Sequence, residues 1–353
     1  MDPVTHMLVG AVVGQVVAGR RLGFGRAAVW GAVAAELPDI DVLISTMATN
    51  GDPLDMLVRH RGVTHALWFG PVVGLLAGFL LVRSTNGARA SPLWWSGLLA
   101  AAMLSHPLLD VCTHYGTQLL SPFSDRRFAL PALPVIELVY TAIFALGLAA
   151  SAFHLRRRRP DRAVWSGVSA IVVSTAYLLY GLHLNAAAVA YARKDLAARG
   201  ANVAIVYAFP TLLQLHYRRV IARTATEDWV GFVSMARPCP IVWDHRPRND
   251  TAVVDALRAS YEGRIFEWFT TGLTAAYADQ RRVFLTDLRY GLMTDVLRGN
   301  WRLEADIGLS PQEIGPARFV RSPSPTASPS NVMHLLHEAY PANCSEEAAA
   351  FEF

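Results

Sequence analysis

The chain has 353 residues, of which 53% are hydrophobic and only 17% are charged, with a net charge of +4. This composition is too apolar for an ordinary soluble protein and predicts a membrane protein of about two domains, one of them soluble. The basic residues are almost all arginines, and they form no stripe interleaved with aromatic residues, so we expect no nucleic-acid partner.

Six apolar segments in the first half of the chain predict a helical membrane bundle. Four are short, and the last two are about as long as the roughly 20 residues that a bilayer crossing needs. The predicted fold class is therefore mainly α, with about six apolar helices in a membrane domain over residues 1–185. The segments are residues 7–19, 27–35, 66–82, 92–105, 133–155 and 163–183.

Arginines in alternate connections between these segments predict the orientation of the bundle. Ten arginines lie within residues 20–26, 83–89 and 156–162, against four in the other connections. The positive-inside rule places the arginine-rich connections in the cytoplasm. We therefore expect a multi-pass membrane protein, with the other connections and the soluble domain on the exported side.

A change of composition after residue 185 predicts the soluble part. Residues 186–200 predict an amphipathic linker helix, and residues 201–320 predict a small α+β domain. Strands are expected at 203–209, 217–224, 229–235, 283–287 and 301–307. Residues 321–353 form a Pro/Ser linker and a C-terminal tail. The three cysteines include no CxxC pair, so they imply no cysteine zinc site.

Four clusters of metal-type residues border the apolar segments of the first third. Histidine and carboxylate together are the ligand set of zinc, manganese or iron. Charged groups beside such apolar segments are costly, which requires a reason for them. Six ligands exceed what one catalytic zinc binds, so we expect either two ions or fewer true ligands. The predicted metal ligands are His6, Asp39, His60, His65, His106 and Asp110.

The spacing within the clusters leaves alternatives open. His106 and Asp110 share a face if the helix continues through Pro107, but a structural His–Asp hydrogen bond fits the same spacing. His60 and His65 fit one helical face poorly, and Gly62 between them predicts a turn from which both rings could converge.

Three further charged residues are candidates for catalysis rather than for metal binding. Glu36 or Asp41, whichever does not bind the metal, would be the general base, although the same acidic residues could form a solvated helix end. The guanidinium of Arg61 suits a substrate anion such as a phosphate, although it could equally lie among lipid head groups.

At these clusters the chain resembles the YdjM-like family of inner-membrane proteins, over roughly residues 1–185. The matching pieces are Leu37-Pro38-Asp39-Ile40-Asp41, His60-Arg61-Gly62-Val63-Thr64-His65 and His106-Pro107-Leu108-Leu109-Asp110, together with Thr5-His6. The stretch from His60 to His65 is the most specific of them. The resemblance implies a bound divalent metal and hydrolysis, and it leaves the substrate undefined.

These observations together predict a membrane-bound metal-dependent hydrolase with its site at the exported face of the membrane. Zinc is the expected cofactor, as one or two ions, with manganese or iron as alternatives. A site among membrane lipids favours a phosphate ester or lipid-linked substrate. The alternative is a non-catalytic metal-binding membrane protein whose soluble domain binds a partner. A transporter is disfavoured, because the charges cluster at one face and not at the midplane.

Overall fold

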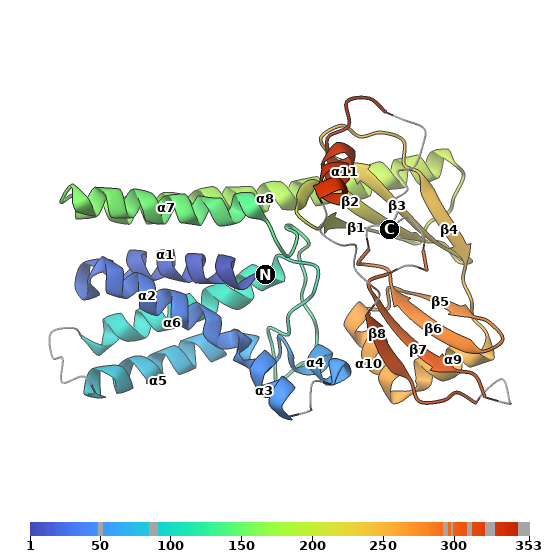
Figure 1. Ribbon diagram of the computed structural model, residues 1–353, viewed down its shortest axis with the longest axis horizontal. Coiled ribbons are helices and arrows are strands. Elements are labelled where there is room, and N and C mark those ends of the chain that lie inside the picture. Colours follow the sequence, from blue (N-terminus) through green and yellow to red (C-terminus); the bar gives the residue numbers. More distant parts are fainter. Residues whose placement is uncertain are drawn as a thin grey trace. The chain divides into compact units, whose positions relative to one another are not determined.

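The structure, a computed structural model, divides the chain into two compact units, residues 1–181 and residues 182–353 (Figure 1). The first unit is helical, and the second contains two β-sheets. The described residues are 1–48, 52–84, 91–291, 296–297, 299–308, 313–321 and 329–344.

The first unit consists of helices joined by short connections. The side chain of Asp2 caps the first helix by accepting a hydrogen bond from the Thr5 amide, and Pro3 occupies the first helical position. The elements are α1 (Pro3–Leu22), α2 (Phe24–Glu36), the 3₁₀ helix η1 (Leu37–Asp39), α3 (Ile40–Ala48), α4 (Pro53–Arg59), the 3₁₀ helix η2 (Val63–His65), α5 (Phe69–Ser84), α6 (Pro92–Val111), α7 (Leu138–Arg156) and α8 (Pro160–Ala198).

Glycines allow α1 and α2 to cross at backbone contact distance. A Cβ atom added at Gly10 would lie 2.3 Å from the carbonyl oxygen of Gly31, and one at Gly31 would lie 2.2 Å from that of Gly10. Neither position therefore accepts a larger side chain without a backbone shift. The crossing fixes the path of α2, and the end of α2 contacts α6, where His106 Nδ1 lies 2.6 Å from the carbonyl oxygen of Ala35.

Alanine at position 31 should destabilise the helical unit, because the added methyl group would overlap backbone atoms of α1. We expect a loss of about 1–3 kcal/mol, the usual cost of overpacking, measured as a lower unfolding temperature in detergent. Gly25 in the same helix has open space at its Cβ position. The control Gly25→Ala should therefore be neutral or slightly stabilising. Equal unfolding temperatures for the two variants would contradict the close crossing.

Only two helices of the described chain are long and apolar enough to cross a membrane by themselves, α7 and α8. The pair Pro53–His65 and Phe69–Val82, bent by 59°, adds a third crossing if it acts as one broken span. The prediction of about six membrane-spanning helices is therefore wrong. The two segments predicted at full crossing length, 133–155 and 163–183, correspond to α7 and α8, the two helices that are long and apolar enough to cross a membrane.

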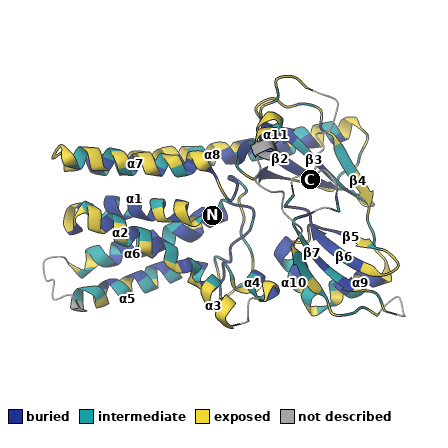
Figure 2. Ribbon diagram, in the orientation of Figure 1, coloured by how far each residue is buried: buried dark blue, intermediate teal, exposed yellow. Residues whose placement is uncertain are grey.

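The other apolar segments do not qualify as membrane spans because their helices are too short or contain buried polar groups. Helices α2 and α5 have 13 and 16 residues, below the roughly 20 that a crossing needs. Helices α1 and α6 have 20 residues each, but α1 buries Gln15 and α6 buries His106 and Asp110. These helices pack on one another, whereas much of the α7 surface is exposed (Figure 2).

The second unit contains two four-stranded antiparallel sheets, ordered β1-β2-β3-β4 and β5-β6-β7-β8. The expected strands are confirmed as β1, β2, β3, β6 and β7, and β4, β5 and β8 were not anticipated. The predicted small α+β domain is thus built around two sheets. Its elements are β1 (Ile205–Thr211), β2 (Gln214–Arg223), β3 (Glu227–Ser234), β4 (Trp243–Pro247), α9 (Ala252–Ala259), α10 (Tyr261–Thr270), β5 (Thr274–Ala278), β6 (Arg282–Asp287), β7 (Trp301–Asp306), β8 (Arg318–Arg321) and α11 (Pro329–Ala339).

Helix α8 continues without a break from the first unit into the second. Its 39 residues are about twice what a membrane crossing requires. The last part of the helix buries Ala188, Ala192 and Leu196 against Val220 and Ala222 of the first sheet. The predicted linker helix at 186–200 is therefore the end of α8.

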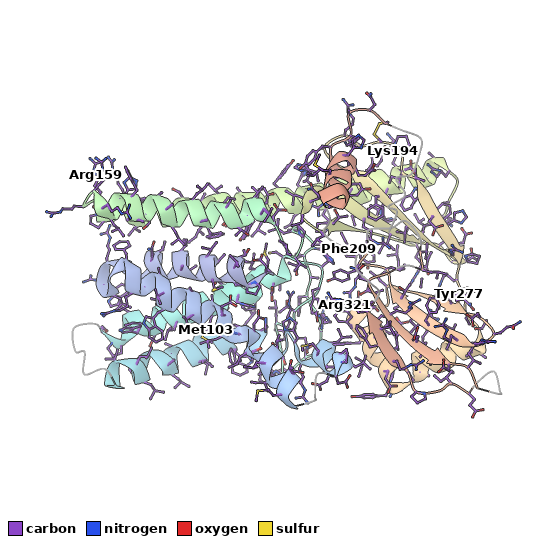
Figure 3. All side chains as sticks on the ribbon, in the orientation of Figure 1. Met103, Arg159, Lys194, Phe209, Tyr277 and Arg321 are labelled. Carbon is purple, nitrogen blue, oxygen red and sulfur yellow. A yellow bond between two sulfur atoms is a disulfide. The ribbon has the colours of Figure 1, made fainter. Side chains whose placement is uncertain are left out.

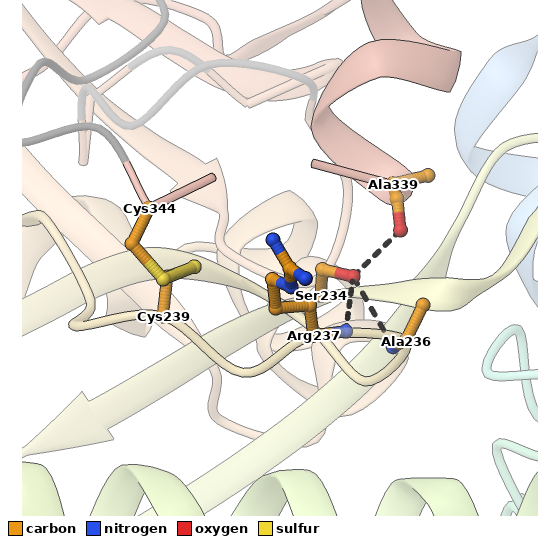
Figure 4. The surroundings of a disulfide bond; sticks show 6 residues. All are labelled: Ser234, Ala236, Arg237, Cys239, Ala339 and Cys344. Atoms are coloured by element: carbon orange, nitrogen blue, oxygen red, sulfur yellow. Dashed lines mark hydrogen bonds between the residues drawn. A yellow bond between two sulfur atoms is a disulfide. The ribbon is translucent and has the colours of Figure 1, made fainter. Parts of the chain in front are cut away.

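A disulfide between Cys239 and Cys344 joins the segment after β3 to the segment after α11 (Figure 4). Beside it, the Ser234 hydroxyl donates a hydrogen bond to the carbonyl oxygen of Ala339, at 2.6 Å. Leu335 of α11 packs against Tyr217 of β2. The disulfide and these contacts attach the C-terminal helix to the first sheet.

Candidate metal centre

The metal-type residues of all four sequence clusters meet in the helical unit. They come from five local settings: His6 from the first turns of α1, Asp39 from η1, Asp41 from α3, His60 and His65 from the connection around η2, and His106 and Asp110 from α6. Helix α6 continues through Pro107, so His106 and Asp110 do share a helical face.

Four ligand atoms from three of these segments converge on one point. Asp39 Oδ1 lies 3.3 Å from both His65 Nε2 and His106 Nε2. Asp110 Oδ2 lies 3.4 Å from His65 Nε2 and 3.5 Å from His106 Nε2. All four atoms are buried, and among the described residues none of them makes a hydrogen bond of acceptable geometry. Buried polar atoms without partners are costly and call for an explanation.

The spacing of the four atoms fits a divalent metal. With metal–nitrogen and metal–oxygen bonds of about 2.0–2.1 Å, the edge of a tetrahedron measures about 3.3–3.4 Å. Four of the six edges are the distances just given, between 3.3 and 3.5 Å. Two imidazole nitrogens and two carboxylate oxygens are also the donors that zinc accepts.

The two central histidines are oriented through their other ring nitrogens. His106 Nδ1 faces the carbonyl oxygen of Ala35 at 2.6 Å, which requires a proton on Nδ1. His65 Nδ1 lies 3.3 Å from Asp41 Oδ2 and 3.0 Å from the hydroxyl of Thr64. A proton on Nδ1 of each ring leaves Nε2 with its lone pair directed at the four-atom centre. A carbonyl or carboxylate behind a histidine is typical of metal sites.

Asp41 contacts this centre only through His65. Its Oδ2 accepts hydrogen bonds from the Arg61 amide at 3.1 Å and from the Thr64 hydroxyl at 2.8 Å. Its Oδ1 lies 3.0 Å from His60 Nδ1. These contacts give Asp41 an orienting role, and the general-base role stays a prediction.

Arg61 is buried against Asp110. It adopts a left-handed backbone conformation with φ of 63°, and its Nε lies 3.0 Å from Asp110 Oδ2. Its guanidinium carbon lies 4.6 Å from the centre of the Tyr115 ring, and Nη1 donates to the hydroxyl of Thr113 at 3.1 Å. These contacts show Arg61 neutralising Asp110, and its role in holding a substrate anion stays a prediction.

His6 and the amino group of Met1 lie on the other side of Asp110. The His6 ring stacks on His106 with centroids 3.6 Å apart, and its Nε2 lies 3.3 Å from Asp110 Oδ1, which the amino group of Met1 also contacts. Burial alone would raise the pKa of Asp110, but Arg61 and this amino group hold that pKa well below its usual range. Asp110 is therefore an ionised carboxylate.

The ligand atoms also group into two sets of three. Within each set, the atoms lie within 4.8 Å of one another. Glu36 belongs to neither set, and burial raises the pKa of its carboxyl to about 7. A pKa near neutrality suits a general base, which is the role predicted for Glu36. The first set is His6, His106 and Asp110, and the second is Asp39, His60 and His65.

Comparison with known proteins places this unit in a family. Residues 1–187 match the family model described as YdjM inner membrane protein. The chain belongs to this family. The resemblance seen in the sequence is thereby confirmed, and with it a location in the inner membrane. All the candidate metal-site residues fall inside the matched region.

A curated relative is similar to part of the chain. The inner membrane protein YbcI of Escherichia coli (strain K12) is 34% identical over 149 residues, which cover 40% of this chain and 78% of the relative. No solved structure matches the chain.

Sequence reasoning missed several residues that support the centre. Thr64 lies within the most specific motif, between two expected ligands, and that position was a usable signal. Tyr115 and Thr113 follow the last cluster and carry no metal-type group, so their contacts with Arg61 depend on the tertiary structure. The carbonyl oxygen of Ala35 carries no side-chain signal at all.

Proposed function

We propose that this YdjM-family protein is a membrane-bound, metal-dependent hydrolase that acts on a phosphate ester or a lipid-linked phosphate. The observation that carries the proposal is the grouping of the His and Asp ligands into two sets of three, each with its atoms within 4.8 Å of one another. Between the two sets, four buried ligand atoms of Asp39, His65, His106 and Asp110 have no hydrogen-bond partners among the described residues. Arg61 already neutralises Asp110, and a bound cation would neutralise Asp39 and satisfy the remaining unpaired ligand atoms.

Hydrolysis favours two ions over one. A single ion bound by all four central atoms would have no free coordination position, which is typical of a structural site. One ion in each set of three ligands would leave a free position on each, which is typical of a catalytic site. The tetrahedral spacing favours the one-ion arrangement, and with it the alternative of a non-catalytic metal-binding protein. Metal stoichiometry therefore separates the two functions.

Different residues of this chain would have different roles in hydrolysis. Divalent ions, when bound, would polarise the scissile bond and lower the pKa of a bound water molecule. Asp41 and the Ala35 carbonyl oxygen hold His65 and His106 in orientation, and Glu36 would take up a proton. Asp39 and His60 are 24% and 18% exposed, whereas His65, His106 and Asp110 are at most 1% exposed, so substrate would enter on the side of Asp39 and His60.

The proposed location of the metal centre on the exported side now depends on the two spans α7 and α8, and no longer on six. The hydroxyls of Thr5 in α1 and Thr141 in α7 lie 2.6 Å apart, and Arg20 near the end of α1 contacts Asp161 at the start of α8. The metal centre is therefore at the end of the unit away from the α7–α8 turn, where Figure 3 labels Arg159. By the positive-inside rule this arginine-rich turn would lie in the cytoplasm and the metal centre on the exported side.

The second unit would lie on the exported side as well, because α8 starts at the cytoplasmic turn and ends in that unit. A disulfide suits an oxidising compartment. In cells that express Cys112→Ala, a thiol reagent should label no cysteine before reduction and Cys239 and Cys344 after it. Labelling before reduction would contradict the exported location.

Hydrolysis is tested on the purified full chain loaded with zinc or manganese. The wild type should bind two ions per chain and cleave a chromogenic phosphodiester or a lipid phosphate. His106→Ala should lose both metal and activity. One ion per chain, with no activity on either substrate class, would support the non-catalytic alternative. Activity that His106→Ala retains would come from another site or a contaminant.

A further inference from the structure

A groove runs between α7 and α8, and its end at His154 and Arg162 borders the α7–α8 turn, at the end of the helical unit opposite the metal centre. It encloses about 520 Å³, within the range of small-molecule sites. The two helices touch where a Cβ atom at Gly147 would lie 2.7 Å from that of Ala170, and both residues line the groove. The remaining lining runs along one face of each helix, from Ile143 to His154 and from Arg162 to Val173.

The groove is apolar along most of its length and polar at one end. Leu146, Trp165 and Val173 line it and are more than half exposed, on helices that qualify as membrane spans. Its polar end holds His154 and Arg162, next to the arginine-rich turn of residues 156–159. This distribution matches an amphipathic molecule with an anionic head and an apolar tail.

The two polar side chains at this end of the groove have unused hydrogen-bonding groups among the described residues. The guanidinium of Arg162 has no ion pair or hydrogen bond among the described residues, and the neighbouring Asp161 pairs with Arg20 instead. His154 Nδ1 is buried and has no hydrogen-bond partner in the described part of the chain. A buried ring nitrogen without a partner and a free guanidinium together suit a phosphate group.

The length of the groove matches one leaflet of a bilayer. From Ile143 to His154 the helix rises about 16 Å at 1.5 Å per residue. Half of a hydrocarbon core of about 30 Å is about 15 Å. An acyl chain lying in the groove would therefore reach the midplane with its head group at His154 and Arg162.

We propose that this groove binds an anionic phospholipid of the leaflet that faces the arginine-rich turn, with the phosphate at Arg162 and His154 and an acyl chain between α7 and α8. Basic pockets between membrane helices on the cytoplasmic side are known to hold anionic head groups. The site is separate from the metal centre, and it is independent of whether the protein is a hydrolase.

Native mass spectrometry of the full chain in detergent tests the proposal, with phosphatidylglycerol and phosphatidylcholine of the same acyl chains as probes. The wild type should bind phosphatidylglycerol at least about fivefold more tightly, since one arginine near the surface contributes about 1 kcal/mol. Arg162→Gln should remove this preference. Ser169→Trp, which fills the groove from an exposed position, should weaken the binding of both lipids.

Arg156→Gln is the matched control, because it removes the same charge from the end of α7 outside the groove. It should keep the preference for phosphatidylglycerol. Equal loss in Arg156→Gln and Arg162→Gln would mean unspecific attraction and overturn the proposal, as would unchanged binding in Ser169→Trp. A dimer that Ser169→Trp dissociates would assign the groove to a second copy of the chain. Unfolding temperatures equal to the wild type exclude misfolding as the cause.

Discussion

Asp110→Asn should abolish metal binding in the purified full chain and reduce any hydrolytic activity to background. Asp110 contributes Oδ2 to the four-atom centre and is 1% exposed. The neutral amide is nearly the same size, so the change removes the charge and half of the oxygen donors without opening a cavity. Substitution of a residue that only orients a metal ligand costs about 10–100-fold in metal affinity, so the loss of a ligand should exceed 100-fold.

Asp125→Asn is the control for Asp110→Asn, because it removes an exposed carboxylate from the connection that follows α6. Elemental analysis after dialysis against zinc should find wild-type metal in this control and background metal in Asp110→Asn. The Asp110→Asn protein loses the partner of the buried Arg61, so its folding is checked by its unfolding temperature. Undiminished metal in a folded Asp110→Asn protein would remove Asp110 from the centre.

Asp41→Asn should weaken metal binding by about 10–100-fold and leave the number of bound ions at saturation unchanged. Its Oδ2 lies 3.3 Å from His65 Nδ1 and accepts from Arg61 and Thr64, so it orients a ligand without reaching the four-atom centre. Removing the carboxylate behind a metal-bound histidine has an effect of this size. Competition with a chelator of known affinity measures it.

Comparing metal affinity and activity in Asp41→Asn and Asp110→Asn shows which of the two aspartates binds the metal. If Asp41→Asn lost metal as completely as Asp110→Asn, Asp41 would be a ligand. If it kept wild-type affinity but lost activity, Asp41 would be the general base that the sequence suggested. Asp55→Asn alters a carboxylate that pairs with Arg59 and accepts from the Ser45 hydroxyl, and that lies in neither ligand set, so it should change neither quantity.

The sequence predicted the two membrane-spanning helices because their apolar segments are long and uninterrupted. It overestimated the number of spans because a helix packed on other helices is as apolar as one that faces lipid. Gly10, Gly14 and Gly31 in the α1–α2 crossing distinguish the two cases, but their close approach appears only in three dimensions. In the second unit, β4 and β8 have four or five residues each, too few for a clear alternating pattern.

The members of the candidate metal centre were accessible from residue type, but their roles were not. His106 and Asp110 could be paired by their four-residue spacing. That His65 would meet them, with Asp41 behind it, depends on how η2 lies against η1 and α6. Arg61 could be read from the sequence only as a free cation, because its ion pair with Asp110 joins residues 49 positions apart.

X-ray absorption at the zinc edge of the purified full chain tests most directly whether Asp39, His65, His106 and Asp110 bind a divalent metal. The wild-type protein should show nitrogen and oxygen neighbours at about 2.0–2.1 Å from the zinc, with the outer-shell scattering of imidazole. Asp110→Asn should abolish this signal. Zinc that is absent after loading, or that shows only a hydrated shell without imidazole, would contradict the account.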